Sequence, residues 1–168
     1  MPIYIDFLQS YSELPFHFIA HRDSTMNTTT SNPFDNAAQA WGATLLRVAL
    51  GTMWITHALL KVLVYTLPGA AQFFSSVGLP GFMVYPVVAM ELLGGTALLL
   101  GFYGRQASLL LAPILVVAAW VHLPNGWVFS NAKGGWEYPV FLLVASLSHW
   151  LLGDGKWAAR HSRLLVPA

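Results

Sequence analysis

Long apolar runs separated by short polar turns dominate the chain from about residue 45 onward. They predict four membrane-spanning helices, at residues 45–67, 82–102, 105–123 and 137–153. A span needs about 20 apolar residues, so the first three have the required length. The fourth is short and would need its flanking residues or a locally thinner bilayer. The pattern therefore predicts an all-α fold, an integral membrane four-helix bundle.

Proline and glycine divide these runs from one another. The stretch 68–81 begins with Pro68-Gly69 and ends with Gly78-Leu79-Pro80-Gly81, so it is predicted to be a loop between the first two spans. Pro113 falls inside the third run and predicts a kink there.

The ends of the chain differ from this apolar part. Residues 1–36 are predicted to form a disordered or loosely ordered N-terminal tail, and 37–155 the transmembrane domain. Met26 offers a second possible start. Residues 1–25 are therefore either a true N-terminal segment or an extension of the predicted gene upstream of the real start. Residues 156–168 are predicted to be a basic C-terminal tail.

Lysine and arginine are distributed unequally between the two sides of the predicted bundle. The cations on one side are Arg47, Arg105, Lys156, Arg160 and Arg163, and Lys133 alone lies in a loop on the other side. Short cytoplasmic loops carry the excess of Lys and Arg. We therefore expect a multi-pass protein of the inner (plasma) membrane with both termini on the cytoplasmic side.

The composition agrees with a membrane protein and excludes several functions. Hydrophobic residues make up 56% of the 168 residues and charged residues only 9%, against about 25% charged in soluble domains. The net charge of +1 argues against a nucleic-acid partner. Because the chain has no cysteine, thiol–disulfide exchange, cysteine-ligated iron–sulfur clusters and CxxCH haem attachment are excluded.

Ionisable residues inside the first two spans are the strongest functional signal. Charge at membrane depth is costly and needs a partner. At a rise of about 1.5 Å per residue, His57 and Lys61 lie roughly 15 Å and 10 Å below Leu67. Glu91 lies roughly 13 Å below Phe82, so a contact with Lys61 or His57 is expected. His57 and Glu91 are the candidate catalytic residues.

A wider set of residues is expected to bind a cofactor, and no metal ligands are predicted. The set is Arg47, Trp54, His57, Lys61, Glu91, His122 and Glu137. Each also has a structural explanation. Lys61 and Glu91 can simply fix helix register, Arg47 can snorkel to the headgroups, and His122 can belong to an interfacial aromatic belt.

Several motifs, in this order, resemble the DoxX family. They are RxxxGxxxxxHxxxK at Arg47–Lys61, Gly78-Leu79-Pro80, Glu91 in MELLGG, GFYGR at 101–105 and GGWEYP at 134–139. The resemblance implies a four-helix inner-membrane protein of the DoxX/DoxD type. The family takes its name from subunits of a terminal quinol oxidase and a thiosulfate:quinone oxidoreductase. It also implies that Arg47, His57, Lys61, Glu91 and Glu137 form the site.

Three functions are compatible with this sequence. The favoured one is a membrane component of a redox system that binds quinone in the bundle, and an oxidoreductase subunit is one form that this component can take. A non-catalytic membrane scaffold or partner subunit is the alternative, and a small proton-coupled carrier is a weaker one. Haem held by His57 and His149 is disfavoured. The expected partners are the lipid bilayer and a soluble or membrane redox protein, with a homo-oligomer left open.

Overall fold

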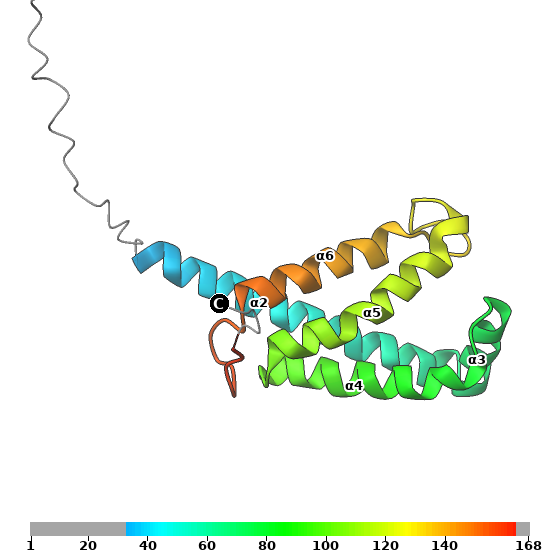
Figure 1. Ribbon diagram of the computed structural model, residues 1–168, viewed down its shortest axis with the longest axis horizontal. Helices are drawn as coiled ribbons and strands as arrows, with labels where there is room; N and C mark the ends of the chain where they lie inside the picture. The colour runs from blue at the N-terminus through cyan, green and yellow to red at the C-terminus, as the bar shows by residue number, and fades with distance from the viewer. Residues whose placement is uncertain (1–32, 164–168) are drawn as a thin grey trace, which may run out of the picture. The chain divides into compact units, whose positions relative to one another are not determined.

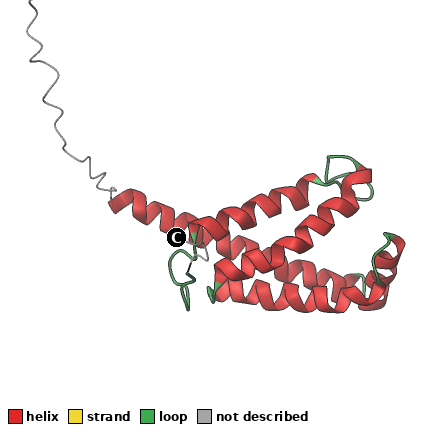
Figure 2. Cartoon of the chain, in the orientation of Figure 1, coloured by secondary structure: helices red, strands yellow, loops and turns green. Residues whose placement is uncertain are grey.

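The fold is built from helices, with no strand, within the part of the chain that the structure describes, residues 33–163 of a computed structural model (Figures 1 and 2). The predicted tail at 1–32 and the final residues 164–168 lie outside it. The elements in order are α2 (Pro33–Leu59), the π-helical turn η2 (Leu60–Val64), α3 (Leu67–Ser76), η3 (Gly81–Met83), α4 (Val84–Leu100), α5 (Gly104–His122), η4 (Leu123–Asn125) and α6 (Glu137–Leu152).

The predicted helical membrane bundle is confirmed. Among the described residues, three helical stretches are long and apolar enough to cross a membrane: Phe34–Val64, Gly81–Leu100 and Gly104–Asn125. The fourth helix, α6, is apolar but has only 16 residues, as its short apolar run indicates. Many large apolar side chains stay exposed on the helices, among them Leu63 at 72% and Leu93 at 74%. On a membrane protein such side chains face lipid rather than water.

The first helix begins well before the predicted span. Helix α2 starts at Pro33, so residues 33–36 are helical although they were expected to lie in the tail. Phe34–Val64 has 31 residues, about 46 Å of helix against a hydrocarbon core of about 30 Å. Its N-terminal turns extend past the other helices, at the end of the bundle where the C-terminal segment lies (Figure 1). Those turns therefore reach beyond the bilayer core.

The prediction of a loop at 68–81 is wrong for most of this stretch, because helix α3 covers Leu67–Ser76. Thr66, at φ 61°, caps this helix, and its Oγ1 accepts a hydrogen bond from the Gly69 backbone N–H at 3.3 Å. Pro68 sits in the first turn, where its missing N–H costs no helical hydrogen bond. The proline that was interpreted as a helix breaker is therefore part of a helix start.

Helices α2 and α4 pack closely because glycines face each other at their contact. A Cβ atom on Gly51 would lie 2.9 Å from the carbonyl oxygen of Gly95, and one on Gly95 would lie 3.1 Å from that of Gly51. Such small residues allow helix backbones to approach in membranes. Next to this contact an apolar layer of Leu50, Trp54 and Leu98 is buried together with Leu111 and Leu142.

The last described residues of the chain, 153–163, pack against the bundle. We call residues 153–163 the strap. Its backbone forms hydrogen bonds with the turn between α4 and α5. The Ala159 N–H donates to the carbonyl oxygen of Leu100 at 3.0 Å, and the Arg160 N–H donates to that of Gly101 at 3.0 Å. The strap end of the bundle therefore lies opposite the end where α3 is found (Figure 1).

Candidate functional site: an apolar cavity with an ion pair

A cavity of about 470 Å³ lies among the helices, with walls from α2, α3, α4, α5 and α6. Its surface is mostly apolar, with Phe73 and Phe74 contributed by α3. The ionisable and hydroxyl groups in its wall are His57, Lys61, Glu91, His122 and Tyr138. Ligand pockets commonly combine a volume of about 300–1,000 Å³ with an apolar lining and a few polar groups. The cavity has the form of a small-molecule site.

Lys61 and Glu91 form a two-pronged ion pair in the wall of this cavity. Lys61 Nζ lies 2.7 Å from Glu91 Oε1 and 2.9 Å from Oε2, which confirms the predicted contact between the first two spans. Glu91 is only 2% exposed. Lys61 lies in the π-helical turn η2, and such turns often occur at functional sites.

His57 lies one turn from Lys61 and faces the same cavity. Its Nδ1 is 3.0 Å from the carbonyl oxygen of Met53. Because a carbonyl only accepts, we assign the proton to Nδ1, which leaves the Nε2 lone pair free when the ring is neutral. The imidazole ring also stacks on Tyr138, with 6.0 Å between centroids and 20° between planes.

Two more predicted residues line the cavity. Trp54 is 2% exposed, and its indole Nε1 has no hydrogen-bond partner among the described residues. His122 comes from the end of α5, and its Nδ1 lies 3.1 Å from the carbonyl oxygen of Lys133. The same Nδ1 also lies 3.3 Å from Asn125 Nδ2. Five of the predicted site residues therefore lie together in the cavity wall: Trp54, His57, Lys61, Glu91 and His122.

Glu137 does not line this cavity. Its Oε1 accepts a hydrogen bond from the Phe129 backbone N–H at 2.8 Å, so it holds the loop before α6. The next residue, Tyr138, occupies the cavity wall instead. Tyr138 was not among the predicted site residues, although its place at the start of the fourth apolar run was a usable signal.

Arg47 lies away from the cavity and does not snorkel to the headgroups. It is 2% exposed. Its guanidinium donates to the carbonyl oxygens of Leu98 at 2.9 Å and Leu99 at 3.2 Å, near the end of α4, and to that of Lys156 in the strap at 3.1 Å. The residue therefore fastens the strap to the first two spans.

His149 also lies outside the cavity. It is fully buried, and its Nδ1 is 2.8 Å from Ser108 Oγ on α5. On α6 it follows the cavity residue Leu142 by two turns, roughly 10 Å along the axis. His57 lines the cavity and His149 does not, so the structure does not bring the two together as a haem-binding pair. No group of three His, Asp or Glu residues within 33–163 could hold a metal ion.

Known proteins resemble this chain. The DoxX family model matches residues 42–123. The chain is 35% identical over 113 residues to "Putative oxidoreductase CatD" of Bacillus subtilis (strain 168), covering 67% of this chain and 80% of that protein. It is 31% identical over 84 residues to "Inner membrane protein YqjF" of Escherichia coli (strain K12), covering 50% of this chain and 63%, less than two thirds, of that protein. No solved structure matches significantly.

Proposed function

The chain belongs to the DoxX family, and we propose that it is an inner-membrane component of a redox system that binds quinone in its cavity. One observation carries this proposal: the apolar cavity of about 470 Å³ has Lys61, Glu91 and His57 together in its wall. A quinone has the matching chemistry, an apolar ring with carbonyl oxygens. The printed name of the Bacillus subtilis relative, "Putative oxidoreductase CatD", agrees with it.

Each polar residue has a distinct role in this proposal. Lys61 can donate a hydrogen bond to a quinone carbonyl, because Glu91 accepts two of its three donors and the third has only a long contact of 3.5 Å with the His57 carbonyl oxygen. His57, held by Met53, offers Nε2 for proton exchange. Tyr138, Phe73 and Phe74 provide aromatic surface against which a ring can pack.

Reduction of a quinone to a quinol takes up two electrons and two protons. His57 and the Lys61–Glu91 pair exchange the protons in this proposal. The chain has no cysteine, so the electrons come from a redox partner protein or a separately bound cofactor. The excess of Lys and Arg at the strap end supports an orientation with both termini in the cytoplasm.

This function is tested by comparing quinone binding of the His57→Phe variant with that of the wild-type protein. Phenylalanine keeps an aromatic ring beside Tyr138 but removes the Nε2 group. Binding of a short-tailed ubiquinone analogue to the purified protein, titrated by native mass spectrometry, should weaken roughly three- to tenfold, the value of one hydrogen bond. His161→Phe is the matched control, because His161 is exposed on the strap; it should bind as the wild type does.

A scaffold role is the second candidate, and the ion pair itself favours it. Lys61 and Glu91 neutralise each other and join η2 to α4, which stabilises helix register without any ligand. Failure of the wild-type protein to bind the quinone analogue, with intact helicity, would reject the redox function and favour the scaffold.

A further inference from the structure

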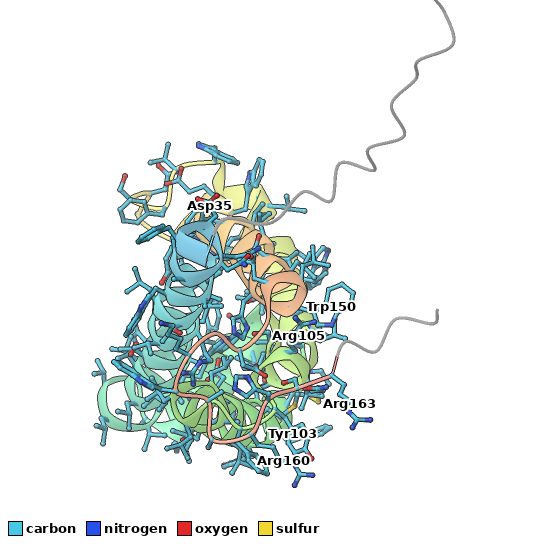
Figure 3. The ribbon with its side chains drawn as sticks, turned by 90° about the vertical axis from the view of Figure 1, so that its left-hand side faces the viewer. Asp35, Tyr103, Arg105, Trp150, Arg160 and Arg163 are labelled. Carbon is cyan, nitrogen blue, oxygen red and sulfur yellow. The ribbon has the colours of Figure 1, made fainter. Side chains whose placement is uncertain are left out.

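Three arginine side chains gather at the strap end, far from the cavity. Arg105 lies in the first turn of α5, and its backbone N–H donates to Ser162 Oγ at 3.2 Å. Its guanidinium lies against Gly153, and its Nε is buried with no hydrogen-bond partner among the described residues. Gln106 Nε2 donates to the carbonyl oxygen of Arg163 at 3.1 Å. Arg160 lies with its guanidinium carbon 4.9 Å from the centroid of the Tyr103 ring. Arg105, Arg160 and Arg163 lie on one side of this end of the molecule (Figure 3); we call them the arginine cluster.

Within residues 33–163 no side chain of the arginine cluster forms an ion pair with a carboxylate, and Asp154 is the one acidic residue bonded beside these three cations. Within residues 33–163 the one ion pair is Lys61–Glu91, at the other site. The acidic residue nearest in the chain, Asp154, is 3% exposed, and its oxygens accept the backbone N–H groups of Arg105 and Ser162. Asp35, at the start of α2, lies on the opposite side of this end (Figure 3).

The surface beside the cluster is apolar and faces outward. Exposed side chains there are Leu100 at 59%, Phe102 at 49%, Leu109 at 43% and Leu110 at 61%. They belong to α4, α5 and the turn between them, at the rim of two membrane spans. Lipid acyl chains cover such a face, so their headgroups lie level with the arginine cluster.

We propose that the arginine cluster is a binding site for the headgroup of an anionic phospholipid whose acyl chains lie on the exposed face of α4 and α5. A guanidinium group can donate two parallel hydrogen bonds to the oxygens of one phosphate, a bidentate contact. The net negative charge of the headgroup balances the cations that have no carboxylate partner. At the same end of the molecule, Trp157, 78% exposed on the strap, packs edge-on against Trp41 of α2, and indoles of this kind anchor in headgroup layers.

The strap is what assembles this site. Arg160 and Arg163 are held beside Arg105 because the strap backbone pairs with the turn at 100–103. The isolated bridge between Phe102 and Arg160 is part of that pairing. A bound lipid would therefore join the strap, α4 and α5 at the membrane surface.

Lipid retention by the full chain tests the proposal. Protein purified in mild detergent is mixed with equal amounts of phosphatidylglycerol and phosphatidylcholine of identical acyl chains, and bound lipid is counted by native mass spectrometry. We expect preferential retention of phosphatidylglycerol. Arg160→Gln with Arg163→Gln should reduce the preference roughly fivefold for each arginine, from about 1 kcal/mol per cation. Lys133→Gln, which removes a cation from a loop outside the strap, should leave it unchanged.

Three results would overturn the proposal. Equal retention of the two lipids by the wild type is one, and an unchanged preference in the folded double glutamine variant is another. Displacement of phosphatidylglycerol by inorganic phosphate, at an ionic strength matched with chloride, would indicate a soluble-anion site instead. If the glutamine variant does not fold, a chloride series on the wild type decides. The preference must fall as salt screens the charges, and a salt-independent preference rejects the site.

Discussion

Lys61 and Glu91 are 30 positions apart in the chain, yet the ammonium of one lies within 2.9 Å of both carboxylate oxygens of the other. Glu91 is 2% exposed, so it depends on Lys61 for its neutralisation. Removing one partner of a buried pair costs about 3–5 kcal/mol, whereas replacing both by apolar residues is often neutral. We therefore expect Lys61→Met to destabilise the protein and Lys61→Met with Glu91→Leu to recover most of the loss.

Thermal unfolding in detergent, followed by circular dichroism, measures both variants of the ion pair. Lys133→Met is the matched control, since it removes a lysine outside the ion pair, and its melting temperature should equal that of the wild type. A single Lys61→Met variant as stable as the wild type would show that the pair contributes nothing to the fold.

Gly51→Ala should separate α2 from α4. A Cβ atom at Gly51 meets the Gly95 carbonyl oxygen at 2.9 Å, and backbone cannot rotate away as a side chain can. Overpacking of this kind costs about 1–3 kcal/mol. Gly42→Ala, in the same helix with nothing within 4 Å, is the control and should be neutral or stabilising, because alanine favours helix over glycine. Equal melting temperatures for the two variants would contradict the close glycine contact.

Arg47→Met should release the strap while leaving the helices in place. The substitution removes every hydrogen bond from the guanidinium to Leu98, Leu99 and Lys156. Hydrogen–deuterium exchange should then accelerate at the amides of Ala159 and Arg160, which are bonded to Leu100 and Gly101 in the intact strap. Arg163→Met, an exposed arginine on the strap, should leave exchange at these two amides unchanged. Unaltered exchange in Arg47→Met would show that the strap holds without Arg47.

Ser108→Ala should destabilise the strap end by leaving His149 without a partner. Ser108 Oγ and His149 Nδ1 are 2.8 Å apart, and each residue is at most 1% exposed. His149 Nε2 has no partner among the described residues either. Leaving a buried polar group unsatisfied costs about 1–3 kcal/mol. Ser76→Ala, on the exposed side of α3, is the control. The free energy of unfolding of both variants is measured by chemical denaturation, and equal values would argue against the Ser108–His149 bond.

The sequence by itself determined the membrane class, the helical fold and the cavity's ionisable groups His57, Lys61, Glu91 and His122. Hydrophobic runs of spanning length are a local property, so they identify the spans without knowledge of packing. Charge inside a span is equally visible, and the cost of burying it requires a partner. With two consecutive spans placed side by side, helical rise alone sets Lys61 near the depth of Glu91. For this reason the ion pair could be predicted.

Only the tertiary structure decided where Arg47, Glu137 and Tyr138 belong and what the strap does. The depth of a residue along a helix does not tell which way its side chain points around the helix axis. In α6 that orientation places Tyr138 in the cavity wall, whereas Glu137 binds the loop before the helix. The strap contacts join residues that are far apart in the chain, such as Arg105 and Ser162, 57 positions apart. No local pattern encodes such pairings, because they depend on how the spans pack. The arginine cluster exists for the same reason.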